Sequence, residues 1–222
     1  MHRDAQATGL VGVIPLNRLD RAKSRLAAVL TPAERSELAL TLAERTLDAL
    51  RDSGVLEQIA VVSPDPAALA WTEGHGALPL RQTSLGLNTG LALARAWAME
   101  RGAVGLLIAL GDLPLLTGDE IRRFVAMTRL YERVVALAPD RARDGTNLLL
   151  ARPPARAALA YGRGSFARHR RLAQRRGIPT VEFHAPGAAF DVDTPDDVRE
   201  LIARGLWPPA KMTDPARNGE QP

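Results

Sequence analysis

The sequence predicts a single α/β domain, with an open, mostly parallel sheet flanked by helices. Short apolar runs alternate with longer segments of helical periodicity, as expected when helices connect parallel strands. Residues 104–110 form the most apolar run, which indicates a central strand buried on both faces. No repeat, low-complexity block or internal linker interrupts the 222-residue chain, so we expect one domain over residues 10–206.

The expected strands are the short apolar runs, in the order in which they occur along the chain. They lie at residues 10–16, 58–63, 77–81, 104–110, 133–138, 146–151 and 180–184. The expected helices lie between and after them, at residues 32–52, 65–74 and 87–101, after Thr117, at 165–177, and at 195–204.

Several helix starts carry specific signals. Thr31 and Glu34 match a capping box, and Thr117 with Glu120 repeats the pattern. Ser165 is expected to cap the helix that follows it. These signals support the element boundaries independently of the apolar pattern.

The charge balance argues against a nucleic-acid partner. The chain has 29 Lys and Arg against 25 Asp and Glu, a net charge of only +4. The densest basic run, residues 168–176, lies on one expected helix and has no interleaved aromatic residues on which bases could stack. We interpret this run as a solvated helix face near an anionic small ligand.

Other compositional features indicate a cytoplasmic protein. No apolar run approaches the ~20 residues that span a bilayer, so we expect no membrane partner. Residues 1–9 lack the pattern of a signal peptide and form an N-terminal extension, and the proline-rich, polar residues 207–222 form a flexible C-terminal tail. The chain has no Cys, which excludes disulfides and thiolate metal sites and fits the cytoplasm.

Asp112 directly follows the most apolar strand. Ligands of open α/β sheets bind outside the carboxyl ends of the strands, so a carboxylate here is well placed to hold a metal ion. The alternative is that Asp112 only shapes the turn before Pro114. Position alone leaves both interpretations open.

Asp191 and Asp193 flank Val192 in a segment that we expect to be extended. Residues two apart in an extended chain point to the same side, so both carboxylates can face one point while Val192 faces the core. Adjacent carboxylates repel unless a cation lies between them, and Mg²⁺ accepts such ligands together with substrate phosphates. Asp193 could instead cap the next helix, but Thr194 already supplies a cap, which favours the metal interpretation.

The loop after the first strand, residues 17–26, is basic and contains Arg18, Lys23 and Arg25. Phosphates often bind at this position, although the loop lacks the glycines of a Walker or Rossmann motif. The only other lysine is Lys211, so Lys23 indicates that a compact ammonium is needed here, the alternative being retention by chance. A solvated basic turn is the alternative. We expect Lys23 to face an anion site with little packing around it.

A glycine-rich segment, residues 161–166, leads into the helix that begins near Ser165. Gly162 lets the backbone approach a ligand, and a helix N-terminus favours anions. Thr146 lies at a similarly small and polar strand entrance, residues 145–147. Each of these features is an ordinary turn or cap in the alternative interpretation. The four His residues are scattered without metal-ligand spacing, and we assign them to surface or core roles.

Taken together, these segments resemble the phospholactate guanylyltransferase family of coenzyme F420 biosynthesis. The matching segments follow the order of the family from about residue 10 to residue 204. They are residues 15–26, 63–65, 86–88, 110–115, 145–147, 161–166 and 191–195. Tyr161 stands where many relatives carry Phe, which is a mild departure.

The resemblance implies a nucleotide-diphospho-sugar-transferase-like, Rossmann-like fold and a Mg²⁺-dependent transferase. The implied reaction joins GMP from GTP to a small phospho-acid and releases pyrophosphate. In the family the acid is 2-phospholactate, phosphoenolpyruvate or 3-phosphoglycerate, and the sequence does not distinguish among them. The implied partners are GTP and the acid, and the downstream enzyme that consumes the guanylylated product is a further candidate.

The same resemblance assigns roles to individual residues. The implied metal ligands, which are also catalytic, are Asp112, Asp191 and Asp193. The groups implied to hold the acid are Thr146, Gly162 and Ser165. The residues expected on the nucleotide side are Arg18, Lys23, Ser63, Gly86 and Asn88, of which Lys23 is the catalytic, phosphate-binding lysine.

Two alternatives remain. Other nucleotidyltransferases of this fold, such as a molybdopterin guanylyltransferase or a sugar-phosphate nucleotidyltransferase, usually have a glycine-rich first loop, which residues 17–25 lack. A non-catalytic binding module would use the acidic residues as a structural metal clip. Pyrophosphate release from GTP with each candidate acid separates these possibilities.

Overall fold

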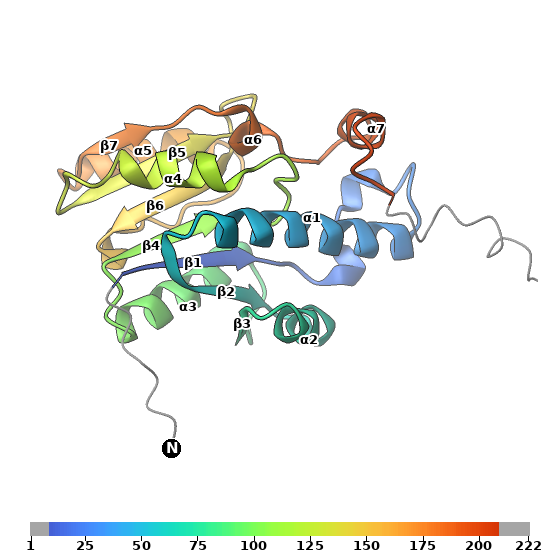
Figure 1. The fold of residues 1–222 in the computed structure, drawn as a ribbon, viewed down its shortest axis with the longest axis horizontal. Helices are drawn as coiled ribbons and strands as arrows, with labels where there is room; N and C mark the ends of the chain where they lie inside the picture. Colours follow the sequence, from blue (N-terminus) through green and yellow to red (C-terminus); the bar gives the residue numbers. More distant parts are fainter. Residues whose placement is uncertain (1–8, 209–222) are drawn as a thin grey trace, which may run out of the picture.

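The computed structural model describes residues 9–208 and has the predicted α/β architecture (Figure 1). Its core is a seven-stranded sheet with the order β3-β2-β1-β4-β6-β5-β7. The strands are β1 (Leu10–Pro15), β2 (Leu56–Ser63), β3 (Leu78–Arg81), β4 (Gly105–Ala109), β5 (Val134–Pro139), β6 (Thr146–Arg152) and β7 (Thr180–Glu182). Only the pairs made by β6 are antiparallel, so the predicted mostly parallel sheet is confirmed.

Helices cover both faces of this sheet, and Figure 1 shows α1 and α4 crossing in front of the strands. One apolar cluster joins the first face to α1 (Pro32–Asp52), α2 (Pro66–Gly74), α4 (Gly118–Ala126) and the short α6 (Pro186–Ala189). A second cluster joins the other face to α3 (Leu87–Glu100) and α5 (Ser165–Arg175). Every residue of β4 is buried, as the apolar run predicted.

The helix starts confirm most of the capping signals. Thr31 with Glu34 and Thr117 with Glu120 form the predicted capping boxes. The predicted cap at Ser165 is wrong, because Gly164 is the N-cap of α5 in a left-handed conformation (φ 69°) and Ser165 is the first helical residue. Glycine adopts this conformation without strain, so Gly164 takes the cap position and the Ser165 hydroxyl makes no cap.

A third apolar cluster lies at one end of the molecule and joins α1 to α7 (Pro195–Ala203). It contains Leu26 of the short helix η2 (Ser24–Leu26), together with Phe190 and Val192. Trp207, which the sequence places at the start of the tail, is also buried in it, at 5% exposure. The remainder of the predicted extension and tail, residues 1–8 and 209–222, lies outside the described residues.

The sequence patterns did not predict α6 or three short 3-10 helices. The latter are η1 (Leu19–Arg21), η2 and η3 (Pro154–Arg156). No helix within residues 9–208 is long and apolar enough to cross a membrane.

Strand direction decides which loops meet. Because β1 and β4 are parallel neighbours, the basic loop after β1 and Asp112 after β4 emerge at the same edge of the sheet. Because β6 is antiparallel to β4, the start of β6 at Thr146 lies at that edge too. The register between β5 and β6 also shifts there, since Pro139 pairs with Thr146 but Ala138 pairs with Leu148. Asn147 is therefore the extra residue of a bulge, a device that re-aims side chains beside binding sites.

Candidate active site

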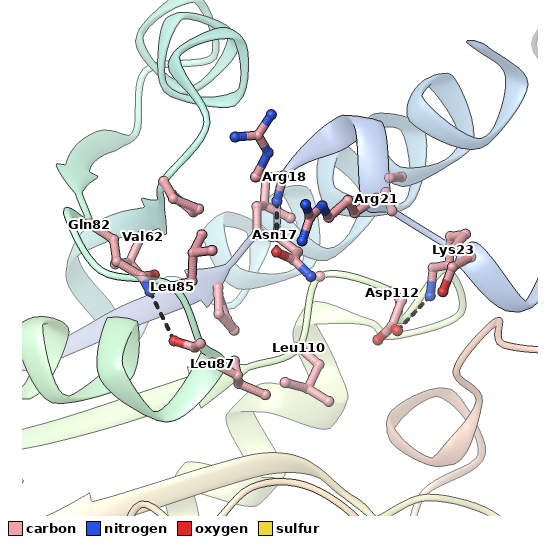
Figure 2. Close-up of a pocket in the computed structure, with 18 of the residues that line it drawn as sticks. Asn17, Arg18, Arg21, Lys23, Val62, Gln82, Leu85, Leu87, Leu110 and Asp112 are labelled. Atoms are coloured by element: carbon pink, nitrogen blue, oxygen red, sulfur yellow. Dashed lines mark hydrogen bonds and ion pairs between the residues drawn. The ribbon is translucent and has the colours of Figure 1, made fainter. Parts of the chain in front are cut away.

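A cavity of about 520 Å³ opens at the edge of the sheet where β1 and β4 end (Figure 2). In Figure 2, Lys23 and Asp112 lie toward one end of the cavity, while Val62, Gln82 and Leu85 lie toward the other. The cavity therefore has a charged end and a less polar end. That arrangement suits a ligand with an anionic part and a flat organic part.

Lys23 links the basic loop after β1 to Asp112, after β4, and to Asp193, before α7. Its Nζ donates to Asp112 Oδ2 at 2.7 Å and lies 3.4 Å from Asp193 Oδ1. Arg25 makes a second ion pair with Asp193, at 2.7 Å. Only 11% of the Lys23 side chain is exposed, so the expectation of little packing around it is wrong. Burial alone would lower the pKa of Lys23, but the two carboxylates outweigh it and raise the pKa above its ordinary value.

Asp191 completes a group of three neighbouring carboxylates. Its Oδ1 accepts a hydrogen bond from Asn147 Nδ2 at 3.4 Å, while Val192 is fully buried, as the predicted alternation requires. Burial, together with the negative charges of Asp112 and Asp193, raises the pKa of Asp191 to about 6. The side chain of Thr194 caps α7 by accepting from the Asp197 N–H, so Asp193 is free of the alternative capping role.

This group fits a cation. Asp112 Oδ1 is buried and has no hydrogen-bond partner, which is costly for a carboxylate oxygen that nothing compensates. The mutual repulsion that raises the Asp191 pKa has the same remedy, a positive charge among the three carboxylates. Within residues 9–208, no group of three His, Cys, Asp or Glu side chains is already arranged to hold a metal ion. In this structure the positive charge between Asp112 and Asp193 is the Lys23 ammonium.

The predicted acid-binding residues form a second group. Thr146 and Ser165 are 1% and 2% exposed, and their hydroxyl oxygens lie 3.4 Å apart. His169, one turn further along α5, places Nδ1 3.0 Å from Thr146 Oγ1. Gly162 is exposed and has a φ of 118°, a conformation that favours glycine. The bulge explains the arrangement, because Thr146 contacts α5 while Asn147 contacts the Ala188 carbonyl of α6.

A backbone segment, residues 160–161, connects the nucleotide side to this second group. Asn88 of α3 accepts from the Tyr161 N–H at 2.8 Å and donates to the Tyr161 carbonyl at 3.1 Å. On the other side, His169 Nε2 accepts from the Ala160 N–H, and Arg168 donates to the Ala160 carbonyl, both at 3.1 Å. Side chains thus bond all four polar backbone groups of the segment.

Of the five residues predicted on the nucleotide side, three line the cavity and two do not. Arg18, Lys23 and Gly86 line the cavity. Ser63 and Asn88 are not among the lining residues. Ser63 Oγ instead accepts from the Asp65 N–H, and both polar atoms of the Asn88 side chain bond Tyr161.

Sequence reasoning missed several residues around these two groups. Gln82 lines the cavity, Asn147 bonds Asp191, and His169 bonds Thr146. One available signal pointed to His169: it lies four residues after Ser165, so both share one face of α5. Gln82 and Asn147 carry no comparable signal, because loop packing and the bulge bring them to the site.

Comparison with known proteins identifies relatives over most of the chain. A family model described as guanylyl transferase CofC like matches residues 10–210. A phosphoenolpyruvate guanylyltransferase of Sphaerobacter thermophilus is 49% identical over 191 residues, covering 86% of this chain and 91% of that protein. A 3-phospho-D-glycerate guanylyltransferase of Phenylobacterium zucineum is 35% identical over 189 residues, covering 83% and 85%.

Solved structures share the fold at lower identity. A Desulfovibrio desulfuricans protein described as a nucleotide-diphospho-sugar transferase superposes with a TM-score of 0.69 at 15% identity, covering 93% of this chain and 91% of its own. A Mycobacterium tuberculosis protein in complex with manganese has a TM-score of 0.54 at 24% identity, covering 89% and 99%. The predicted nucleotide-diphospho-sugar-transferase-like fold is therefore confirmed.

Proposed function

Because the chain belongs to the family described as guanylyl transferase CofC like, we propose that it transfers GMP from GTP to phosphoenolpyruvate and releases pyrophosphate. The reaction would serve coenzyme F420 biosynthesis. The observation that carries the proposal is the meeting of Lys23, Asp112 and Asp193 at the charged end of a nucleotide-sized cavity.

The choice of acid follows the names of the relatives. Several of them, at identities up to 49%, are named phosphoenolpyruvate guanylyltransferases. The 3-phosphoglycerate enzyme is 35% identical, so 3-phosphoglycerate is the second candidate and 2-phospholactate the third.

In the proposed reaction, a phosphate oxygen of the acid attacks the α-phosphorus of GTP. A new P–O bond forms as the bond to the bridging oxygen of the β-phosphate breaks, and pyrophosphate leaves. The attacking group is ionised at neutral pH because the second pKa of a phosphate monoester is near ~6, so no general base is required. The chain must instead hold two polyanions in line. Proximity of this kind supplies up to ~7–11 kcal/mol of the barrier.

The chain's own residues divide this work. Lys23 carries a permanent positive charge at the end of the cavity where the triphosphate would lie, and it can stabilise charge on the departing pyrophosphate. Arg18 and Gly86 line the nucleotide side, and Thr146, Gly162 and Ser165 would hold the acid. Ser63 and Asn88 would then act by supporting the loops that carry these groups.

A divalent cation fits the acidic group, and we propose Mg²⁺. It would be held by Asp112, whose Oδ1 has no other partner, and by Asp191 and Asp193. When bound, it would neutralise and orient the phosphates of both substrates. The predicted cytoplasmic location and the downstream enzyme as a partner remain predictions.

The decisive experiment measures pyrophosphate release by the full chain with GTP and Mg²⁺. Release should require phosphoenolpyruvate, should be weaker with 3-phosphoglycerate or 2-phospholactate, and should stop when the metal is chelated. Asp191→Asn should remove most turnover, and it should stay folded because the change removes charge without altering the size of the side chain. Pyrophosphate release that requires a sugar phosphate instead of a phospho-acid would show that the chain is another nucleotidyltransferase. No pyrophosphate release with any acceptor would indicate a binding module.

A further inference from the structure

His169 lies on the buried face of α5, and its two hydrogen bonds fix the roles of both ring nitrogens. Nε2 lies 3.1 Å from the Ala160 backbone N–H, which can only donate. Nε2 must therefore accept and carries no proton. Burial and the neighbouring charge of Arg168 lower the pKa of His169 to about 4, so the ring is neutral at pH 7. A neutral imidazole has one proton, which leaves Nδ1 as the protonated nitrogen.

The protonated Nδ1 faces Thr146 Oγ1 at 3.0 Å, so Thr146 accepts from His169. A hydroxyl has one proton to donate and two lone pairs that accept. Ser165 Oγ, another hydroxyl, lies 3.4 Å from Thr146 Oγ1. Within residues 9–208, Thr146 Oγ1 has no hydrogen-bond partner besides these two, so its own proton stays off the ring and can point to a bound ligand when one is present.

We propose that His169 is a positioning residue for the acid pocket, which donates Nδ1–H to Thr146 and so leaves the Thr146 hydroxyl proton to bind the phospho-acid. Phosphate and carboxylate oxygens at neutral pH accept hydrogen bonds and do not donate them. A hydroxyl that faces such a ligand must therefore donate, and the tautomer of His169 prevents the Thr146 proton from turning toward the ring. The inference rests on the proposed function, because it takes Thr146 as part of the acid pocket.

The tautomer can be tested without any assay of activity. We expect ¹H–¹⁵N correlation spectra of the full chain, with ¹⁵N-labelled histidine at pH 7, to show the His169 proton on Nδ1. The His169→Asn variant assigns the signals by their loss. A proton on Nε2, or a doubly protonated ring, would overturn the proposal.

Two substitutions separate the two hydrogen bonds of the ring. Asn in place of His169 keeps an amide N–H near the Nδ1 position, whereas Gln keeps an acceptor near the Nε2 position. His169→Gln should raise the KM for phosphoenolpyruvate about tenfold, and His169→Asn should stay within about twofold of the wild type. The KM for GTP should not change in either variant.

Melting temperatures provide the control for this pair. Each variant leaves one buried polar group without its partner, so both should melt at similarly lowered temperatures. Stability then cannot explain a difference in KM between them. An equal rise of the acid KM in both variants, or a rise of the GTP KM that matches it, would contradict the positioning role.

A double-mutant cycle tests whether His169 acts through Thr146. In a Thr146→Val background the hydroxyl is gone, so adding His169→Gln should raise the acid KM no further. Additive effects in an active enzyme would refute the role of His169 alone. A wild-type chain without acid-dependent pyrophosphate release would refute the proposed function itself, whatever the variants do.

Discussion

At the scale of single residues, the charges of the site hold one another in place. Lys23 has its ammonium between Asp112 and Asp193 and adopts a left-handed backbone conformation (φ 49°) that side chains rarely take. Such a conformation in a non-glycine residue persists only where the surroundings impose it. The ion pairs of its ammonium are the contacts that a substitution would remove.

We predict that Lys23→Arg loses much of the turnover and Lys23→Ala loses more. The wide guanidinium cannot occupy the place of a compact ammonium between two carboxylates. Lys23→Ala should also destabilise the fold by about 1–3 kcal/mol, because it leaves Asp112 without its partner. Steady-state kinetics and thermal melts measure both effects, and Arg133→Ala, at an exposed position that does not line the cavity, is the control. Wild-type rates in the Ala variant would remove Lys23 from the mechanism.

Asp191 should give the stability a distinct pH dependence. Its pKa rises from an ordinary value of 3.8 to about 6 on folding. Between these values the folded chain keeps a proton that the unfolded chain releases, so stability falls as the pH rises, by at most about 3 kcal/mol. Below pH 3.8 the Asp191 carboxyl is protonated in both the folded and the unfolded chain, and above about pH 6 the loss of stability is complete.

The measurement is the melting temperature from pH 3.5 to 7.5 in the presence of a chelator, for the wild type and for Asp191→Asn. The variant removes the contribution of this one carboxyl, so the difference between the two proteins isolates it. The wild type should lose stability relative to the variant as the pH rises, and Mg²⁺ at pH 7 should restore it. A constant difference across the range would rule out the raised pKa.

At the scale of elements, Asn88 joins the start of α3 to the segment that leads into α5. Its amide bonds both backbone groups of Tyr161, much as a neighbouring strand would. The start of α3 borders the cavity at Gly86, and the segment after Tyr161 carries Gly162 and Ser165. One side chain therefore couples the loops of the two proposed substrate sites.

We predict that Asn88→Ala raises the KM for GTP and the KM for the acid together, each by roughly tenfold, which corresponds to about 1.4 kcal/mol. The melting temperature should change little, because the exposed Asn88 lets water replace its hydrogen bonds. Leu93→Ala, at a position 40% exposed on the same helix, is the matched control. A change in the GTP KM alone would show that Asn88 contacts the nucleotide directly.

At the scale of the whole molecule, the third apolar cluster supports the segment 190–193, which carries Asp191 and Asp193. Phe190 and Val192 are buried in it, and they alternate with Asp191 and Asp193 along the chain. Trp207 and Leu201 pack in the same cluster, after and within α7. The chain after residue 193 thus returns to hold the backbone that carries Asp191 and Asp193.

Trp207→Ala should therefore affect both stability and turnover. Removing a buried Trp side chain costs about 3–5 kcal/mol, and for a chain of this size we expect the melting temperature to fall by roughly 6–20 °C. Turnover measured below the melting transition should also fall, because the segment that carries Asp191 loosens. Leu130→Ala, at a position 97% exposed, is the control. A melting temperature within 1–2 °C of the wild type would contradict a supporting role for Trp207.

The sequence by itself determined the seven strands, the longer helices and the family. Apolar periodicity and capping pairs such as Thr31 with Glu34 predicted the helices and strands, because these signals act between residues near in the chain. The alternation around Val192 predicted which side chains face the core for the same reason. Motif resemblance predicted the family, which the comparisons confirm.

Only the tertiary structure decided how these parts meet. The antiparallel direction of β6 and the bulge at Asn147 bring Thr146 to the site edge and turn it toward His169. The burial of Lys23 depends on Asp112, which is 89 residues away in the chain. The burial of Trp207 depends on the apolar cluster that joins α1 to α7. Such contacts join segments far apart in the sequence, and local patterns carry no record of which distant residue supplies the charge, the hydrogen bond or the apolar surface.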